Sequence, residues 1–277
     1  MNLVNLTSDE LNLIDKANTF VLIPLASVEQ HGPHLPLGTK GFLSETIACI
    51  AADKLNNEGY NCLVAPTVQF MPCQSSFGFP GIFSMTPRTY SDALYEICSS
   101  FHKEGFRCIF FVNLSVSPDA LKAIETTIED LSIFPDFGVF DPMPLWNFSY
   151  DEKLDEFLKT MNLDIKNEIH GDIKDTSALL ALDPTLVKSE ILSQLNSCKV
   201  NTGWELLKGN ISFKEMGSEL GYLGSPAFAD KEFGNLYLNT ASNALAESMK
   251  FVSQGNKLPE LPLKIKLLLK YIDLDDI

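Results

Sequence analysis

Short apolar runs alternate with helix-length amphipathic segments along the first three quarters of the chain. This alternation is typical of strands joined by crossover helices in a mainly parallel sheet. The expected strands are 19–25, 62–66, 107–113 and 137–140, and the expected helices are 42–58, 87–104, 118–131, 176–188 and 241–253. We therefore predict an α/β fold, built as a single three-layer α/β/α domain over residues 1–277 with a mainly parallel sheet.

The charge of the chain limits its partners. It has 277 residues, with 36 acidic and 21 basic side chains and a net charge of −15. A negative field of this size repels phosphate backbones and anionic lipid surfaces, so we expect neither nucleic acid nor membrane as a partner. The sequence shows no apolar run long enough to span a bilayer and no secretion signal at its start, which predicts a cytoplasmic protein.

A carboxylate and two histidines follow the first expected strand, in the segment SVEQHGPHLPLGTK. In parallel α/β sheets, ligands bind at the carboxyl ends of the strands. Glu29 and His31 are two positions apart, so in an extended chain both side chains point to one side and can bind one divalent cation. Taken alone, such a pair is explained as well by structural packing as by metal binding.

Four segments share their order and spacing with the motifs of a known family. They are SVEQHGPHLPLGT, FGFPGIFSM, HGDIKDTSALLALDPTLV and LGYLGSPAFADKEFG, and together with RCIFFVN the likeness covers about residues 19 to 240. These segments resemble the motifs of the creatininase family of α/β amidohydrolases. The resemblance implies two divalent cations, zinc or manganese, that activate water for attack on the C–N bond of a cyclic or formyl amide.

The resemblance also assigns roles to individual residues. It implies Glu29, His31 and His170 as metal ligands, and it aligns Asp175 with a glutamate of the family's HAGE-x-ETS segment. Asp172 takes a ligand position only if the loop shifts by one residue, because Ile173 falls on the metal-binding glutamate. The resemblance thus leaves an incomplete ligand set.

Other family positions are occupied by residues that do not bind metal. Lys40 stands where the family has a metal-bridging aspartate, and Ser115 stands where it has a ligand histidine. Ser75 and Ser76 replace a Glu-His pair ahead of the FPG string. We therefore expect Glu29, His31, Lys40, His170 and Asp175 at the centre of the site, and we expect His34, Asn113, Ser115, Ser76 and Asp172 around the pocket.

Three hypotheses about function remain open at this point. In the first, the Lys40 ammonium replaces a metal by pairing with Glu29 or Asp175, so that the metal site is degenerate and hydrolase activity is reduced or absent. In the second, a mononuclear metal site rebuilt on Glu29, His31 and His170 supports a functional amidohydrolase. In the third, a desolvated Lys40 with a depressed pKa serves as nucleophile or base in a metal-free enzyme.

The remaining expectations concern ligands and assembly. The family pocket implies a small-molecule ligand, and family members are usually ring-like homo-oligomers, so the resemblance implies a homo-oligomer here as well. A non-catalytic chain of this kind binds a small molecule or pairs with an active homologue. The carboxy-terminal segment 256–277 combines prolines with an apolar run, which predicts a tail or helix that docks on the body or on a neighbouring subunit.

Overall fold

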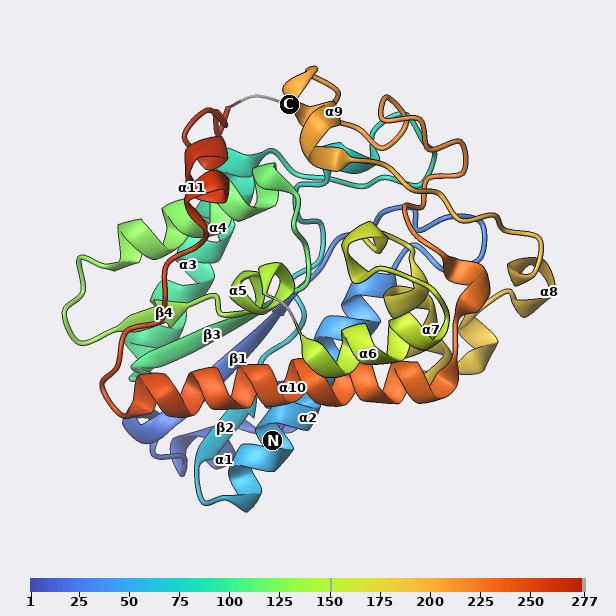
Figure 1. The fold of residues 1–277 in the computed structure, drawn as a ribbon. Coiled ribbons are helices and arrows are strands. Elements are labelled where there is room, and N and C mark those ends of the chain that lie inside the picture. The colour runs from blue at the N-terminus through green and yellow to red at the C-terminus, as the bar shows by residue number, and fades with distance from the viewer. Residues whose placement is uncertain (150, 276–277) are drawn as a thin grey trace.

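The computed structural model describes residues 1–149 and 151–275, and these contain a parallel four-stranded sheet (Figure 1). The strand order is β2-β1-β3-β4, so β1 and β3 lie in the middle. Phe20 in β1 is opposite Cys62 in β2 and Cys108 in β3. The bounds are β1 (Thr19–Leu25), β2 (Asn61–Val64), β3 (Cys108–Asn113) and β4 (Gly138–Phe140). The predicted parallel sheet is confirmed.

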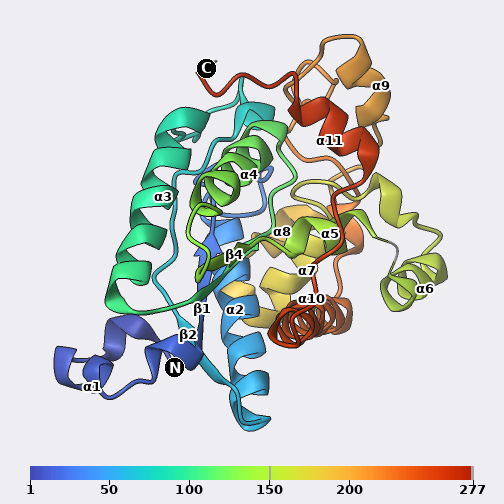
Figure 2. The ribbon, with the colours of Figure 1, turned by 90° about the vertical axis from the view of Figure 1, so that its left-hand side faces the viewer.

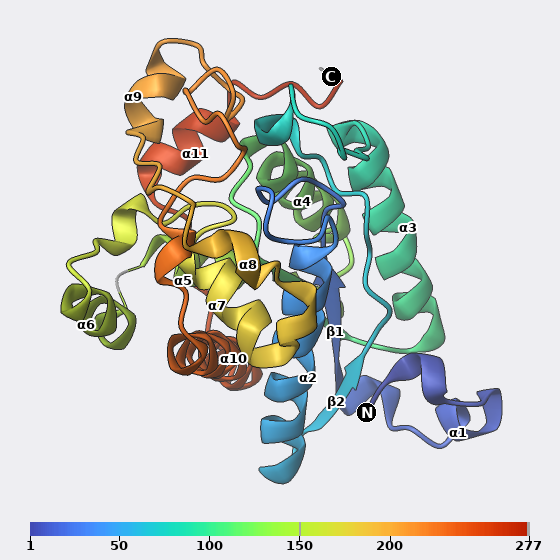
Figure 3. The same ribbon diagram turned by 90° about the vertical axis from the view of Figure 1, so that its right-hand side faces the viewer.

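Helices cover both faces of the sheet, as Figure 2 and Figure 3 show from opposite sides. One layer contains α3 (Pro87–Glu104) and α4 (Pro118–Leu131), and the other contains α2 (Thr39–Asn57), α7 (Ile173–Leu182) and α10 (Lys231–Ser253). Alternate residues of β1 supply the two cores, since Val21 and Ile23 pack in one cluster and Leu22 packs in the other. A strand buried on both faces reads as a continuous apolar run, which is why TFVLIPL was recognisable.

Shorter elements complete the molecule. They are α1 (Ser8–Asn12), α5 (Met143–Phe148), α6 (Glu152–Thr160), α8 (Ser189–Leu192), α9 (Thr202–Leu207) and α11 (Leu263–Leu269). The last of these, α11, lies within the expected carboxy-terminal docking segment and packs on α4 of the same chain. Among the described residues, no helix has the length and apolar character required to cross a membrane.

Besides α2, which begins at Thr39 rather than at residue 42, two helices begin earlier than the sequence pattern indicated. Asp172 accepts hydrogen bonds from the backbone of Lys174 and Asp175, so α7 begins at Ile173 rather than at residue 176. It ends at Leu182 rather than at residue 188, and Pro184 follows in a short 3-10 helix. Asp230 caps α10 in the same way, so that helix begins at Lys231 rather than at residue 241. Polar N-caps fix these starts, whereas the prediction relied on apolar periodicity.

Gly234 belongs to α10, although that helix was expected to begin only at residue 241. A Cβ atom at this position would lie 1.9 Å from the carbonyl oxygen of Ser177 in α7. Only glycine permits so close an approach of the two helices. The contact fixes α7, which carries part of the candidate site, against the longest helix of the fold.

Candidate metal centre and pocket

The candidate site lies where β1 and β3 end. The chain leaves β1 toward β2 on one side, whereas β3 and β4 lie on the other side, so the strand order reverses between β1 and β3. Ligands of open α/β sheets bind outside the strand ends at such a reversal. The segment after β1 carries Glu29 and His31, and the segment after β3 carries Ser115.

Glu29 is buried and held by two serine hydroxyls. Ser27 Oγ donates a hydrogen bond of 2.6 Å to Oε1, and Ser76 Oγ donates to Oε2. Burial alone would raise the pKa of Glu29, but electrostatic interactions with His170 and His31 and the two serine hydrogen bonds lower this pKa below its ordinary value. Glu29 is therefore an oriented carboxylate, as a metal ligand must be.

The two histidines of the site present their rings to one another. His31 and His170 stack with their centroids 4.4 Å apart. His31 Nδ1 lies 2.9 Å from the carbonyl oxygen of Glu29, and His170 Nε2 lies 2.7 Å from that of Gln30. A carbonyl only accepts, so each of these nitrogens carries the proton and donates it. In a neutral ring the other nitrogen, His31 Nε2 or His170 Nδ1, then holds a lone pair.

These groups fit a divalent cation. Glu29, His31 and His170 each offer one ligand atom, and these atoms lie within 4.8 Å of one another. His31 Nε2 is buried and has no hydrogen-bond partner among the described residues. Burial and the neighbouring His170 lower the pKa of His31 to about 3, which keeps the ring neutral near pH 7. A neutral imidazole whose second nitrogen donates to a backbone carbonyl is the usual form of a metal-binding histidine.

Lys40 and Asp175 form a buried ion pair beside this cluster. Lys40 Nζ lies 2.8 Å from Asp175 Oδ1 and 3.0 Å from Oδ2. Asp175 also accepts a hydrogen bond from the backbone of Gly171, and it lies in the first turn of α7, where the helix dipole favours a negative charge. Of the two partners considered from the sequence, Asp175 and not Glu29 binds the ammonium.

The ion pair contradicts the hypothesis of a nucleophilic lysine. Burial alone would lower the pKa of Lys40, but the charge of Asp175 and its hydrogen bonds raise this pKa above its ordinary value. A nucleophilic or basic lysine needs a depressed pKa, so that a neutral amine is present near pH 7. The hypothesis of a depressed pKa therefore does not fit the structure, whereas pairing of Lys40 with Glu29 or Asp175 was the alternative hypothesis, and Asp175 is the partner found.

The other expected site residues lie in different surroundings. Ser115 lines the cavity described below. Ser76 binds Glu29, and His34 Nε2 lies 2.9 Å from Thr176 Oγ1 in a buried position. Asp172 is fully buried as the N-cap of α7. The structure thus brings Glu29, His31, Lys40, His170 and Asp175 together, whereas His34 contacts the Thr176 side chain and Asp172 caps α7.

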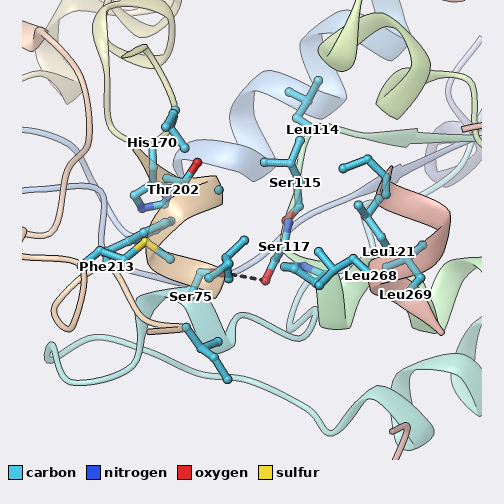
Figure 4. A pocket seen from close by; sticks show the side chains of 18 of the residues that line it. Ser75, Leu114, Ser115, Ser117, Leu121, His170, Thr202, Phe213, Leu268 and Leu269 are labelled. Atoms are coloured by element: carbon cyan, nitrogen blue, oxygen red, sulfur yellow. Dashed lines mark hydrogen bonds between the residues drawn. The ribbon is translucent and has the colours of Figure 1, made fainter. Parts of the chain in front are cut away.

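A cavity of about 250 Å³ opens above the cluster, and Figure 4 shows its lining side chains. Glu29, Lys40 and His170 line one part of it. The rest is formed largely by apolar side chains from α4, α9, α11 and the loop that carries Phe213. Ser75 Oγ and Ser117 Oγ are hydrogen-bonded at 3.1 Å on its wall (Figure 4).

Comparison with known proteins identifies the family. The creatininase family model, described as creatinine amidohydrolase, matches residues 4–249. The chain belongs to the creatininase family. The fold agrees, since a manganese form of creatininase superposes with a TM-score of 0.74 at 22% identity, covering 90% of this chain and 97% of that one. A creatininase variant in complex with creatine superposes with a TM-score of 0.70 at 21% identity, covering 90% and 97%.

A curated relative in the same comparison has a different name. This chain is 32% identical over 104 residues to the mycofactocin precursor peptide peptidase of Mycolicibacterium smegmatis (strain ATCC 700084 / mc(2)155). The match covers 37% of this chain and 42% of that protein, so the chain matches less than half the length of this relative.

Sequence reasoning missed two groups of residues in this creatininase-family site. Ser27 orients Glu29, and its position two residues before the glutamate was the only available signal. The apolar wall from α9 and α11 was also missed, although the run LKIKLLL in segment 256–277 had suggested a docking helix. Local motifs locate ligands, but they do not show which distant segments close a cavity.

Asn113 was expected to line the pocket, but its side chain is fully buried. It accepts a hydrogen bond from the backbone of Ser115 and donates one of 3.1 Å to Asp141 Oδ2. Asp141 Oδ1 is buried and has no hydrogen-bond partner within the described ranges 1–149 and 151–275. Burial raises the pKa of Asp141 from 3.8 to about 7. Between about pH 4 and pH 7, the carboxyl group of Asp141 is ionised in the unfolded chain but protonated in the folded protein. The free energy of unfolding therefore falls as pH rises from about 4 to about 7.

We expect the Asp141→Asn variant to lose this decline, because an amide has no proton to release. The difference in unfolding free energy between pH 4 and pH 7 should shrink by about 1–3 kcal/mol. Urea denaturation across that pH range measures it. Parallel pH profiles of the variant and the unmodified protein would contradict the assignment.

Proposed function

We propose that this protein binds one divalent cation through Glu29, His31 and His170 and uses it to bind a small amide. Its Lys40 ammonium stands in place of a second cation, so that hydrolase activity is reduced compared with a two-metal amidohydrolase. The observation that carries the proposal is the Lys40–Asp175 ion pair, at 2.8 and 3.0 Å, next to a ligand cluster that includes an unpartnered His31 Nε2.

Electrostatics explain why one cation is favoured over two. The Lys40 ammonium is already neutralised by Asp175, and a carboxylate shared with an ammonium is a poor ligand for a cation. A second divalent ion beside Lys40 would meet a repulsion of several kcal/mol at the dielectric of a partly buried site. Two-metal hydrolysis depends on both cations, one for each side of the reacting centre.

The residues of the chain itself have defined tasks in the proposed site. Ser27 and Ser76 hold Glu29, and the carbonyls of Glu29 and Gln30 fix the two histidine tautomers. When bound, a zinc or manganese ion supplies Lewis acidity toward an amide carbonyl. Lys40 anchors Asp175 and leaves no free amine for nucleophilic attack.

The comparisons support an amide as the ligand. The matching family model is described as creatinine amidohydrolase, a name that refers to a cyclic amide, and a curated relative is named as a peptidase of a precursor peptide, whose residues are joined by amide bonds. We therefore propose a small amide or the end of a peptide as the ligand class.

A second candidate function is a working amidohydrolase with this single cation. The unpartnered His31 Nε2 and the oriented Glu29 favour it, since three protein ligands are sufficient for a catalytic zinc site. Product release from cyclic and formyl amides by the zinc-loaded protein separates it from the first proposal. Turnover at a rate typical of enzymes, about 1 per second or faster, would favour this second candidate.

Calorimetric titration of chelator-treated protein with zinc and with manganese tests the proposal. We expect one tightly bound cation per chain. The His31→Ala variant should bind it at least about a hundredfold more weakly, because loss of a ligand exceeds the effect of losing a supporting residue. His102→Ala, which removes a histidine of α3, is the control and should bind normally. No binding, or two equivalent cations per chain, would refute the proposal.

A further inference from the structure

The cavity above the candidate metal centre has one polar part and extensive apolar walls. Among the described residues that line it, Glu29, Lys40 and His170 are the only ones with ionisable side chains. The walls consist mainly of leucine, isoleucine, valine, phenylalanine and methionine side chains. A ligand that matches this surface has one polar end and one bulky apolar group.

The apolar wall begins at a candidate metal ligand. The Phe213 ring lies with its centroid 4.7 Å from that of His170, tilted by 36°. Phe213 and Met216 are buried in a cluster with Leu223, so this part of the wall is packed against the body. A group held next to His170 therefore meets an apolar surface directly.

The opposite wall comes from a helix outside the region that defines the family. Ile265, Leu268 and Leu269 of α11 line the cavity, and α11 packs on α4. Figure 4 shows Leu268 and Leu269 beside Leu121, across the cavity from Phe213 and His170. The family model ends at residue 249, whereas α11 covers Leu263–Leu269. This wall therefore lies outside the residues that the family model matches.

We propose that the site selects amides that carry a bulky apolar side chain, with the amide at the metal centre and the side chain between Phe213 and α11. This inference rests on the proposed function and names its substrate class. The cavity of about 250 Å³ is smaller than the pockets of about 300–1,000 Å³ that hold drug-sized ligands. This volume accommodates one amino-acid-sized amide.

The test compares two amides of similar size and different polarity. N-acetyl-leucinamide and N-acetyl-asparaginamide are titrated into the zinc-loaded, unmodified protein by calorimetry. We expect the leucine amide to bind at least about tenfold more tightly, as expected when an apolar pocket buries a branched hydrocarbon side chain. Equal affinities, or tighter binding of the asparagine amide, would overturn the inference.

Two variants of α11 locate the effect. Leu268→Asn changes a lining residue, and Leu267→Asn changes its neighbour, which is 46% exposed and does not line the cavity. The preference for the leucine amide should fall at least about threefold in the first variant and stay unchanged in the second. An equal effect in both variants would overturn the role of α11. Thermal unfolding checks that the variants fold, and the comparison in the unmodified protein does not depend on them.

The outcomes separate this inference from the proposed function. If zinc binds but the two amides bind equally, the inference fails and the metal centre stands. If zinc does not bind, the proposed function fails, and the same two amides are titrated into the metal-free protein. A tenfold preference of the metal-free protein for the leucine amide supports selection by the apolar cavity without the metal. Equal binding of the two amides by the metal-free protein overturns this inference.

Discussion

Replacing Lys40 by methionine is expected to destabilise the protein by about 3–5 kcal/mol, because Asp175 would remain as a buried charge without its partner. Lys40 and Asp175 are 8% and 2% exposed, so water compensates their charges poorly. Within the described part of the chain, the Asp175 carboxylate keeps only the backbone hydrogen bond from Gly171. Urea denaturation at pH 7 measures the loss.

Two further variants decide whether the loss comes from the unpaired charge. Lys40→Met combined with Asp175→Asn removes both charges and should recover a large part of the stability. Lys54→Met, on the same helix α2, loses only hydrogen bonds to Ser242 and Asn243 and should cost about 1 kcal/mol or less. A double variant no more stable than Lys40→Met alone would argue against the ion pair as the cause.

Introducing the family's ligand types should add a second cation. Lys40→Asp together with Ser115→His removes the ammonium and provides a carboxylate and an imidazole, and both changed positions line the cavity. Without Lys40, Asp175 also becomes available as a ligand. We expect the number of tightly bound zinc ions per chain to rise from one to two, as measured by calorimetry and elemental analysis.

The single substitution Ser115→His is the control for this experiment. It keeps Lys40 and its ion pair, so we expect it to bind one zinc ion like the unmodified protein. If the double variant gains no second ion although it folds, Lys40 and Ser115 do not occupy the positions that the family resemblance assigned to them.

The central layer of the fold was predictable because its physical signal is local. Strand β1 is buried on both faces and reads as an unbroken apolar run, and α3 and α4 each begin with a proline at the first helical position. The starts of α7 and α10 were missed because an aspartate cap, and not an apolar residue, fixes each of them. Gly234 lies in the missed first part of α10, where glycine permits close packing against α7.

The candidate site was predictable in composition but not in pairing. Motifs identified Glu29, His31 and His170, which lie together in the structure. The partner of Lys40 is 135 positions away in the chain, so the sequence left Glu29 and Asp175 as alternatives. The hydrogen bond from Ser76 to Glu29 and the position of α11 at the cavity also depend on contacts between segments that are far apart in the sequence.

Anomalous X-ray diffraction at the zinc edge, from crystals grown with zinc, tests the proposed metal centre most directly. The account predicts one anomalous peak per chain, within coordination distance of Glu29, His31 and His170, and no peak beside the Lys40–Asp175 pair. Two peaks, with Lys40 displaced from Asp175, or no peak at the three ligands would contradict it.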